Sequence, residues 1–171
     1  MEVKIKLDTG ATMPTYAKPR DAGMDLTVLN VKYDDEKDYI EYDSGVAVEI
    51  PEGYVGLVFP RSSISNYDLM LTNAVGVIDS GYRSTIKARF KVITSYEQSH
   101  IDTGDLTRGN FGMTIYPIDE IRGTIHYTPV YKIGDRFAQL IIIPYPKVEF
   151  KVVDELSTTE RGCGGYGSTN N

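Results

Sequence analysis

Hydrophobic and polar residues alternate most clearly in the segment STIKARFKVIT, residues 84–94. Ile, Ala, Phe and Val occupy every second position there, and Lys and Arg stand between them. Because successive side chains of a strand point to opposite faces, this alternation predicts a half-buried strand. The preceding Ser80-Gly81 pair is typical of a hairpin turn, since glycine tolerates positive φ. We therefore expect Asp79 and Tyr82 at the lip of a hairpin, where functional side chains are often presented. Taken alone, this stretch favours a role for Asp79 in closing the turn over a functional one.

Similar short runs follow one another along the chain. They are rich in β-branched and aromatic residues, are separated by turn residues, and lie at residues 3–7, 24–31, 45–50, 54–59 and 137–145. No stretch keeps a helical period over three turns, and only residues 63–71 could hold a short helical turn. Many short strands at even spacing predict an all-β sandwich or barrel. A length of 171 residues fits one domain, whose core we place at residues 1–155.

Two segments depart from this pattern. The acidic run at residues 33–43 lacks the glycine and the ligand spacing of a calcium loop, so we expect a solvated hairpin tip. The C-terminal segment at residues 156–171 is rich in Gly, Ser and Thr. Such a composition is typical of a frayed tail. Glycines around an arginine, followed by Ser-Thr, could also close over phosphates through backbone amides, and both interpretations stay open at this point.

Composition narrows the classes of function. The net charge of −6 and the lack of a basic run argue against nucleic acid as the main partner. A single cysteine, Cys163, cannot form an internal disulfide, which fits a reducing cytoplasm. His100 and His126 lack metal-ligand spacing, so zinc chemistry and a Ser–His triad have almost no candidate residues. The N-terminus shows neither a signal peptide nor a membrane-length segment, and we expect a soluble cytoplasmic protein.

Five short segments carry the side chains that a nucleoside triphosphate needs. Cations and hydroxyls bind phosphate oxygens, a carboxylate supports a metal ion, an amide reads a base and an aromatic ring stacks on it. The segments are AGMDL (22–26), PRSS (60–63), NAVGVIDSGYR (73–83), GDRFAQLI (134–141) and the C-terminal segment.

In this order, the five segments resemble the motifs of the homotrimeric dUTPases (deoxyuridine 5′-triphosphate nucleotidohydrolases). The resemblance implies a jelly-roll β fold that assembles as a homotrimer, with three active sites at the subunit interfaces. It also implies hydrolysis of dUTP to dUMP and pyrophosphate with Mg²⁺ on the triphosphate. Such an enzyme limits uracil in DNA and supplies dUMP.

The resemblance implies roles for the residues around the nucleoside. Asp79 resembles the base of the family, which activates the water that attacks the α-phosphorus. Tyr82 resembles the residue whose ring packs under the sugar and excludes a 2′-hydroxyl. Asn73 and the backbone around Gly76 and Ile78 resemble the hairpin that binds uracil.

The resemblance also implies residues for the metal ion and the phosphates. Asp25 resembles the outer-shell ligand that holds Mg²⁺ through water. The residues that resemble phosphate contacts of the core are Arg61, Ser62, Ser63 and Gln139. The C-terminal segment resembles an arm that closes over a neighbouring active site, with Arg161, Gly167, Ser168 and Thr169 toward the phosphates and Tyr166 over uracil.

The chain between Asp79 and Asp135 is longer than the core of the family needs, and the excess lies at about residues 96–127. A surface hairpin is one interpretation. The other is a partner-binding element whose anchors are Tyr116, Ile118, Ile121 and Tyr127. Chains with such an insertion resemble the dUTPases of staphylococcal phages, which implies a second role as an anti-repressor that binds a repressor protein. A phage origin would place the enzyme in the cytosol of a bacterial host.

Two other functions compete with dUTP hydrolysis. A dCTP deaminase shares the fold implied above, but Arg89 stands where that subfamily has its glutamate. A nucleotide-gated signalling module would bind dUTP and a protein partner without turnover. Release of ammonia from dCTP or of pyrophosphate from dUTP separates the three functions.

Overall fold

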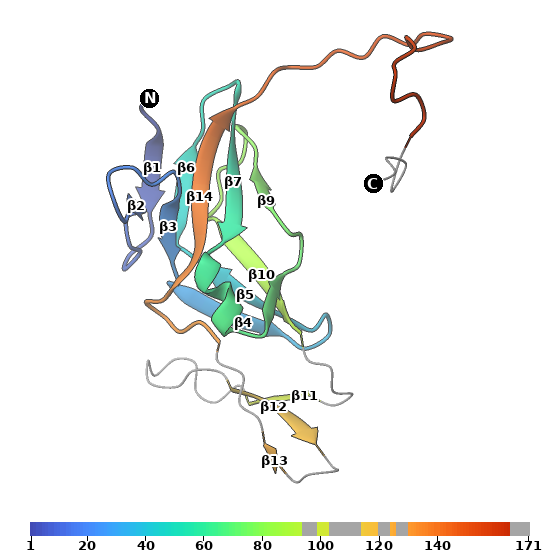
Figure 1. The fold of residues 1–171 in the computed structure, drawn as a ribbon. Coiled ribbons are helices and arrows are strands. Elements are labelled where there is room, and N and C mark those ends of the chain that lie inside the picture. Colours follow the sequence, from blue (N-terminus) through green and yellow to red (C-terminus); the bar gives the residue numbers. More distant parts are fainter. Residues whose placement is uncertain (94–98, 103–113, 120–123, 126–129, 165–171) are drawn as a thin grey trace.

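The computed structural model describes residues 1–93, 99–102, 114–119, 124–125 and 130–164, and this part of the chain is almost entirely β (Figure 1). Its strands are β1 (Lys4–Leu7), β2 (Thr15–Tyr16), β3 (Met24–Thr27), β4 (Asn30–Asp34), β5 (Tyr39–Asp43), β6 (Val46–Glu49), β7 (Tyr54–Pro60), β8 (Leu69–Leu71), β9 (Gly76–Ile78), β10 (Lys87–Val92), β11 (Ser99–Asp102), β12 (Thr114–Asp119), β13 (Thr124–Ile125) and β14 (Arg136–Pro144). One short 3-10 helix, η1 (Ser62–Asn66), precedes β8, as the short helical turn predicted there requires. The all-β prediction is confirmed.

Two larger sheets enclose the core. One has the strand order β2-β3-β14-β7-β9, and the other has the order β4-β5-β10-β8. Figure 1 shows β14 and β7 running along the upper part of the molecule, with β4, β5 and β10 crossing below them. Tyr42 of β5 lies at the centre of the core, with its ring centroid 5.6 Å from those of Phe90, Tyr131 and Phe137. Aromatic pairs at this spacing pack favourably beyond the area that they bury.

The alternation in β10 has the predicted consequence. Ala88 and Phe90 are buried in the core, whereas Lys87 and Arg89 are exposed. The acidic run at residues 33–43 is a solvated hairpin tip only in part. Residues 35–38 connect the antiparallel strands β4 and β5, whereas Tyr39, Ile40 and Tyr42 of β5 are buried in the core.

The predicted hairpin around Ser80-Gly81 is wrong. Strand β9 pairs with β7, whereas β10 pairs with β5 and β8, so the turn connects two different sheets. The chain changes sheets because Ile86 is fully buried and its amide donates to the Val46 carbonyl oxygen at 2.7 Å. The predicted run at residues 24–31 is likewise divided between the two sheets: β3 belongs to the first sheet and β4 to the second.

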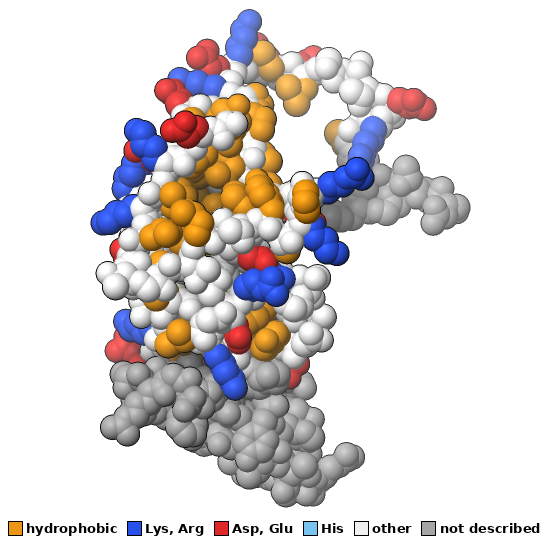
Figure 2. Space-filling model, turned by 90° about the vertical axis from the view of Figure 1, so that its left-hand side faces the viewer, with side chains coloured by type: hydrophobic (Ala, Val, Ile, Leu, Met, Phe, Trp, Pro, Cys, Tyr) orange, Lys and Arg blue, Asp and Glu red, His pale blue; other side chains and the backbone are white. Residues whose placement is uncertain are grey.

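The segment after β14 runs away from the body of the molecule in Figure 1. Phe150 and Val152 are 94% and 96% exposed there. Figure 2 shows hydrophobic side chains gathered over the upper part of one face of the molecule, with the C-terminal segment standing off from it.

The predicted insertion contributes three strands, β11, β12 and β13, which pair only with one another among the described residues. The rest of residues 96–127 lies outside the described part. Within the described ranges, no helix has the length and hydropathy that a membrane span requires.

Candidate active site

Asp25 and Gln139 lie on adjacent strands, and Arg61 lies beside them directly after a third strand. Asp25 of β3 lies opposite Gln139 of β14, and Gln139 lies opposite Phe59 of β7. Arg61 follows the last residue of β7, and its Nε donates to Asp25 Oδ1 at 2.7 Å. The Gln139 side-chain amide donates to the Pro60 carbonyl oxygen at 3.3 Å. The structure thus brings together residues from three of the five sequence segments.

Arg136 joins this cluster, although the sequence analysis assigned it no role. Its Nη1 donates to Asp25 Oδ2 at 3.0 Å. The register of β14 against β3 shifts between Arg136 and Ala138. Strand alternation alone therefore does not place the Arg136 side chain next to Asp25. Two guanidinium groups on one carboxylate leave a net positive charge, which suits phosphate oxygens.

The Asp25 carboxylate has room for one further role. A carboxylate offers about four lone-pair positions, of which Arg61 and Arg136 use two. The described residues contain no group of three or more His, Cys, Asp or Glu side chains that could hold a metal ion by themselves. A Mg²⁺ ion at Asp25 therefore needs oxygen ligands from a substrate, and contact with Asp25 through a water fits this arrangement.

Ser62 and Ser63 begin η1 directly after Arg61. The turn is closed by the Ile64 amide, which donates to the Arg61 carbonyl oxygen at 2.9 Å. Ser62 is exposed and Ser63 is half-buried. Both serines thus lie next to the positively charged cluster, as their predicted contact with phosphate requires.

A second group of predicted residues lines a groove of about 400 Å³. Asn73, Gly76 and Tyr82 form part of its wall, and Lys87 and Arg89 form another part. The pKa of Lys87 is raised: partial burial acts to lower it, but the neighbouring Asp43 and Glu41 carboxylates outweigh burial. Both cations belong to the polar face of the alternating segment at residues 84–94, which is the sequence signal for their exposure.

The backbone next to Asn73 has an unusual conformation. Ala74 has a φ of 57°, in the left-handed region that few residues other than glycine adopt. The side chain of Ile78 is only 8% exposed and belongs to the core. Its predicted contact with uracil can therefore involve only its backbone.

Asp79 follows β9 and is exposed. Its backbone carbonyl closes the turn by accepting the Tyr82 amide at 3.0 Å, and Arg83 Nη1 donates to the Ser80 carbonyl oxygen at 2.6 Å. Within the described residues, the Asp79 carboxylate has no hydrogen bond or ion pair. The side chain is therefore not needed to close the turn, and it is available to a water or a ligand.

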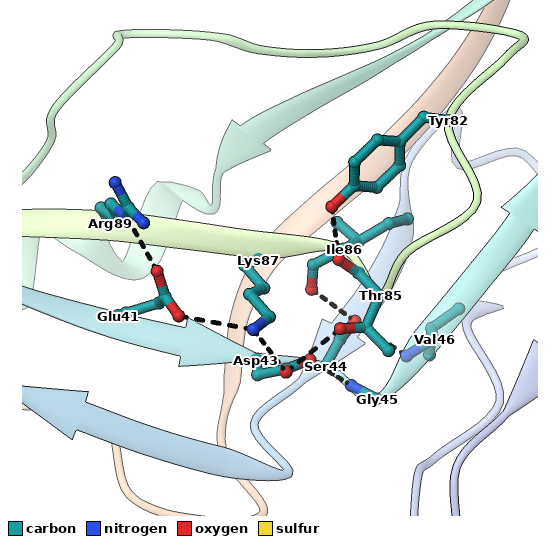
Figure 3. A network of polar contacts seen from close by, with 10 residues as sticks. All are labelled: Glu41, Asp43, Ser44, Gly45, Val46, Tyr82, Thr85, Ile86, Lys87 and Arg89. Atoms are coloured by element: carbon teal, nitrogen blue, oxygen red, sulfur yellow. Dashed lines mark hydrogen bonds and ion pairs between the residues drawn. The ribbon is translucent and has the colours of Figure 1, made fainter.

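Tyr82 is held through its hydroxyl. The ring is 38% exposed, and Oη donates to the Thr85 carbonyl oxygen at 3.0 Å. Figure 3 shows that Thr85 in turn faces Asp43, at the end of β5. Neither Thr85 nor Asp43 was singled out from the sequence, because 42 residues separate them.

The register of β7 separates Asp79 from the cluster around Asp25. Ile78, the residue before Asp79, lies opposite Gly56, and Arg61 stands five residues further along the chain than Gly56. Continuing this antiparallel register sets Asp79 level with Val55, six residues before Arg61, so at the rise of a strand the two are on the order of 20 Å apart along β7. One chain therefore holds the predicted base and the predicted phosphate-binding residues at opposite ends of the same strand.

The C-terminal segment contributes one described candidate. Arg161 Nε donates to the Gly164 carbonyl oxygen at 3.2 Å, and no contact among the described residues joins Arg161 to the other site residues. Tyr166, Gly167, Ser168 and Thr169 lie outside the described residues.

Comparisons with known proteins give one consistent family. The sequence model of the dUTPase family matches residues 9–105 and 126–170. The deoxyuridine 5′-triphosphate nucleotidohydrolase of Cutibacterium acnes is 35% identical over 158 residues, covering 92% of this chain and 84% of the relative. The enzyme of the same name from Escherichia phage T5 is 34% identical over 175 residues, covering 98% of this chain and 97% of the relative.

Solved structures agree with the sequence relatives. The dUTPase of Staphylococcus bacteriophage 80alpha with dUPNHPP has a TM-score of 0.72 and 28% identity, with 99% of each chain covered. A mutant dUTPase from phage phi11 of S. aureus, described as coordinating a structural Mg(II) ion, has a TM-score of 0.64 and 29% identity, with 91% of this chain and 98% of that chain covered. The predicted jelly-roll β fold and the predicted resemblance to staphylococcal-phage dUTPases are confirmed. The chain belongs to the dUTPase family and is a dUTP-hydrolysing enzyme.

Proposed function

We propose that the enzyme hydrolyses dUTP in active sites shared between the subunits of a homotrimer. The observation that carries this proposal is the separation of Asp79 from Arg61 along β7. Hydrolysis of the α-phosphate needs the base and the phosphate-binding cations around one triphosphate, and a single chain does not bring them together. One subunit would supply Asp79 and the groove, and a second would supply the cluster around Asp25.

In the proposed reaction, Asp79 takes a proton from a water molecule while the oxygen of that water attacks the α-phosphorus. The bond from this phosphorus to the oxygen that bridges to the β-phosphate breaks, and its electron pair leaves with pyrophosphate. A positioned base contributes about 10²–10⁴-fold. Arg61 and Arg136 stabilise the charge that develops on the phosphates. Asp25 would hold a Mg²⁺ ion through water, and the ion would neutralise further charge on the triphosphate.

Nucleoside selection is proposed for the groove. Asn73 and the backbone near Gly76 and Ile78 bind the uracil edge, while the ring of Tyr82 leaves no room for a 2′-hydroxyl. The proposed arm, residues 156–171, follows a core of residues 1–155 and closes on a neighbouring site. It brings Arg161, Gly167, Ser168 and Thr169 to the phosphates and Tyr166 to the base.

Pyrophosphate release from dUTP, UTP, dTTP and dCTP, each measured with Mg²⁺ and with EDTA, tests the proposal. We expect Mg²⁺-dependent turnover of dUTP alone. Ammonia release from dCTP would instead support a deaminase. Binding of dUTP without turnover would support a nucleotide-gated signalling module.

Replacing the proposed base tests the mechanism directly. Asp79→Asn keeps the size of the side chain but removes its ability to take a proton. We expect kcat to fall by about 10²–10⁴-fold, with the dissociation constant of a non-hydrolysable dUTP analogue nearly unchanged. A kcat within twofold of the parent enzyme would contradict the assigned role.

A second function is favoured by one comparison. The 80alpha dUTPase is described as a phage dUTPase that controls transfer of virulence genes by a G protein-like mechanism. We propose that the insertion at residues 96–127 binds a repressor protein, since its strands β11, β12 and β13 pair only with one another among the described residues. Deleting residues 98–125 should abolish repressor capture in a pull-down while dUTP turnover persists. Unchanged capture would rule out the insertion as the docking element.

A further inference from the structure

A polar network holds the segment that carries Tyr82 against the end of β5 (Figure 3). We call residues 43–46 the 43–46 clamp. They connect β5 to β6 and lie opposite residues 85–87, the last of which begins β10.

The clamp fixes the backbone of Ile86. Ser44, which is fully buried, donates its hydroxyl to the Ile86 carbonyl oxygen at 2.8 Å, and its amide donates to the same oxygen at 3.1 Å. The Ile86 amide donates to the Val46 carbonyl oxygen at 2.7 Å. Both backbone polar groups of Ile86 are therefore satisfied by the clamp, which leaves this residue little freedom to move.

The clamp reaches Tyr82 through Thr85. Asp43 Oδ2 accepts the Thr85 hydroxyl at 3.1 Å and lies 3.4 Å from Lys87 Nζ. Asp43 Oδ1 accepts the Gly45 amide at 2.8 Å, which holds the carboxylate in place. Thr85 then accepts the Tyr82 hydroxyl on its carbonyl oxygen at 3.0 Å. Thr85 is thus joined to the clamp by its side chain and to Tyr82 by its backbone.

We propose that Thr85 and Asp43 are positioning residues that set the preference of the enzyme for 2′-deoxyribose over ribose. This inference rests on the proposed function, in which the Tyr82 ring excludes a 2′-hydroxyl. The ring can exclude a 2′-hydroxyl only if it is held in place and does not move aside when that hydroxyl is present. Tyr82 is 38% exposed, so packing alone does not fix it, and its hydroxyl is anchored on Thr85.

The experiment compares kcat/KM for dUTP and UTP across a small set of variants. Thr85→Val removes the hydroxyl at nearly constant volume, and Thr85→Ser keeps it. Thr9→Val makes the same chemical change in an exposed turn between β1 and β2. We expect Thr85→Val to lower the dUTP-to-UTP selectivity ratio by roughly fivefold, the effect of one hydrogen bond, and Thr85→Ser and Thr9→Val to leave it within twofold.

A merely structural role would lower kcat/KM for both nucleotides equally, so an unchanged ratio in Thr85→Val overturns the proposal. Thr85→Ala removes the same hydroxyl and replaces Thr85→Val if that variant does not fold. Tyr82→Ala distinguishes the positioning role of Thr85 and Asp43 from the role of the Tyr82 ring itself. If it loses selectivity while Thr85→Val keeps it, only the positioning role fails. If it keeps selectivity, the role of Tyr82 fails as well.

Discussion

Gly23 lies directly before β3, beside Gln139, and its missing side chain leaves room for the Gln139 amide. A Cβ built on Gly23 would overlap Gln139 Oε1. The backbone of Gly23 is not in the left-handed region, so the requirement for glycine is one of space and not of conformation. Gln139 reaches the Pro60 carbonyl oxygen, beside Arg61, across this space.

We predict that Gly23→Ala displaces the Gln139 amide and lowers kcat/KM for dUTP by about tenfold, because the proposed polar contact of Gln139 with the phosphates is lost. The steric origin is tested by a double-mutant cycle. In a Gln139→Ala background, the added methyl group meets no amide, and Gly23→Ala should cost nothing further. Additive losses in the double variant would place the effect of Gly23→Ala elsewhere.

Asp25, Arg61 and Gln139 could be named as candidate site residues from the sequence, because each stands in one of five short motifs that follow one another in a fixed order along the chain. Sequence reasoning did not assign Arg136 a role, since a register shift in β14 brings this arginine to Asp25. It also missed Thr85, whose partner comes from a strand 42 residues away. Local patterns carry no information on such pairings, which depend on strand register and on contacts between segments far apart in the chain.

At the scale of elements, strand existence followed from alternation, but strand partners did not. The pattern in β10 predicted its buried face, and the Ser80-Gly81 turn predicted a hairpin that does not exist. A turn signal specifies a local reversal of the chain and not which sheet receives the next strand. Here the 43–46 clamp decides the sheet, because it satisfies the backbone of Ile86.

Ser44→Ala should therefore destabilise the fold beyond the loss of one surface hydroxyl. The Ser44 hydroxyl also accepts the Val46 amide at 3.2 Å, and alanine would leave this buried amide without its partner. We expect the free energy of unfolding to fall by about 1–3 kcal/mol, measured by urea denaturation at a fixed protein concentration. Ser65→Ala is the matched control, since this exposed hydroxyl donates to the Ser62 carbonyl oxygen. Equal losses in the two variants would contradict the special role of Ser44.

At the scale of the whole molecule, two features of a single chain indicate a neighbouring subunit. The segment after β14 exposes 94% of Phe150 and 96% of Val152, and burying each such side chain contributes about 1.5–3 kcal/mol. Asp79 also stands apart from the cluster of Asp25, Arg61 and Gln139. A neighbouring subunit can account for both features, because it can cover the apolar segment and bring a second set of site residues to Asp79.

Subunit mixing tests whether the sites are shared. We consider two variants, Asp79→Asn and Arg61→Ala, each of which should be almost inactive alone. If one chain supplies Asp79 and another supplies Arg61, trimers refolded from an equal mixture contain some sites in which both residues are intact. Random assembly gives about a quarter of such sites, so we expect about a quarter of the parent activity per site. If each chain built its own site, every site would carry one of the two substitutions, and the mixture would be no more active than either variant alone. The same two proteins, combined without denaturation, serve as the control, because slow subunit exchange should keep their activity low until they are refolded together.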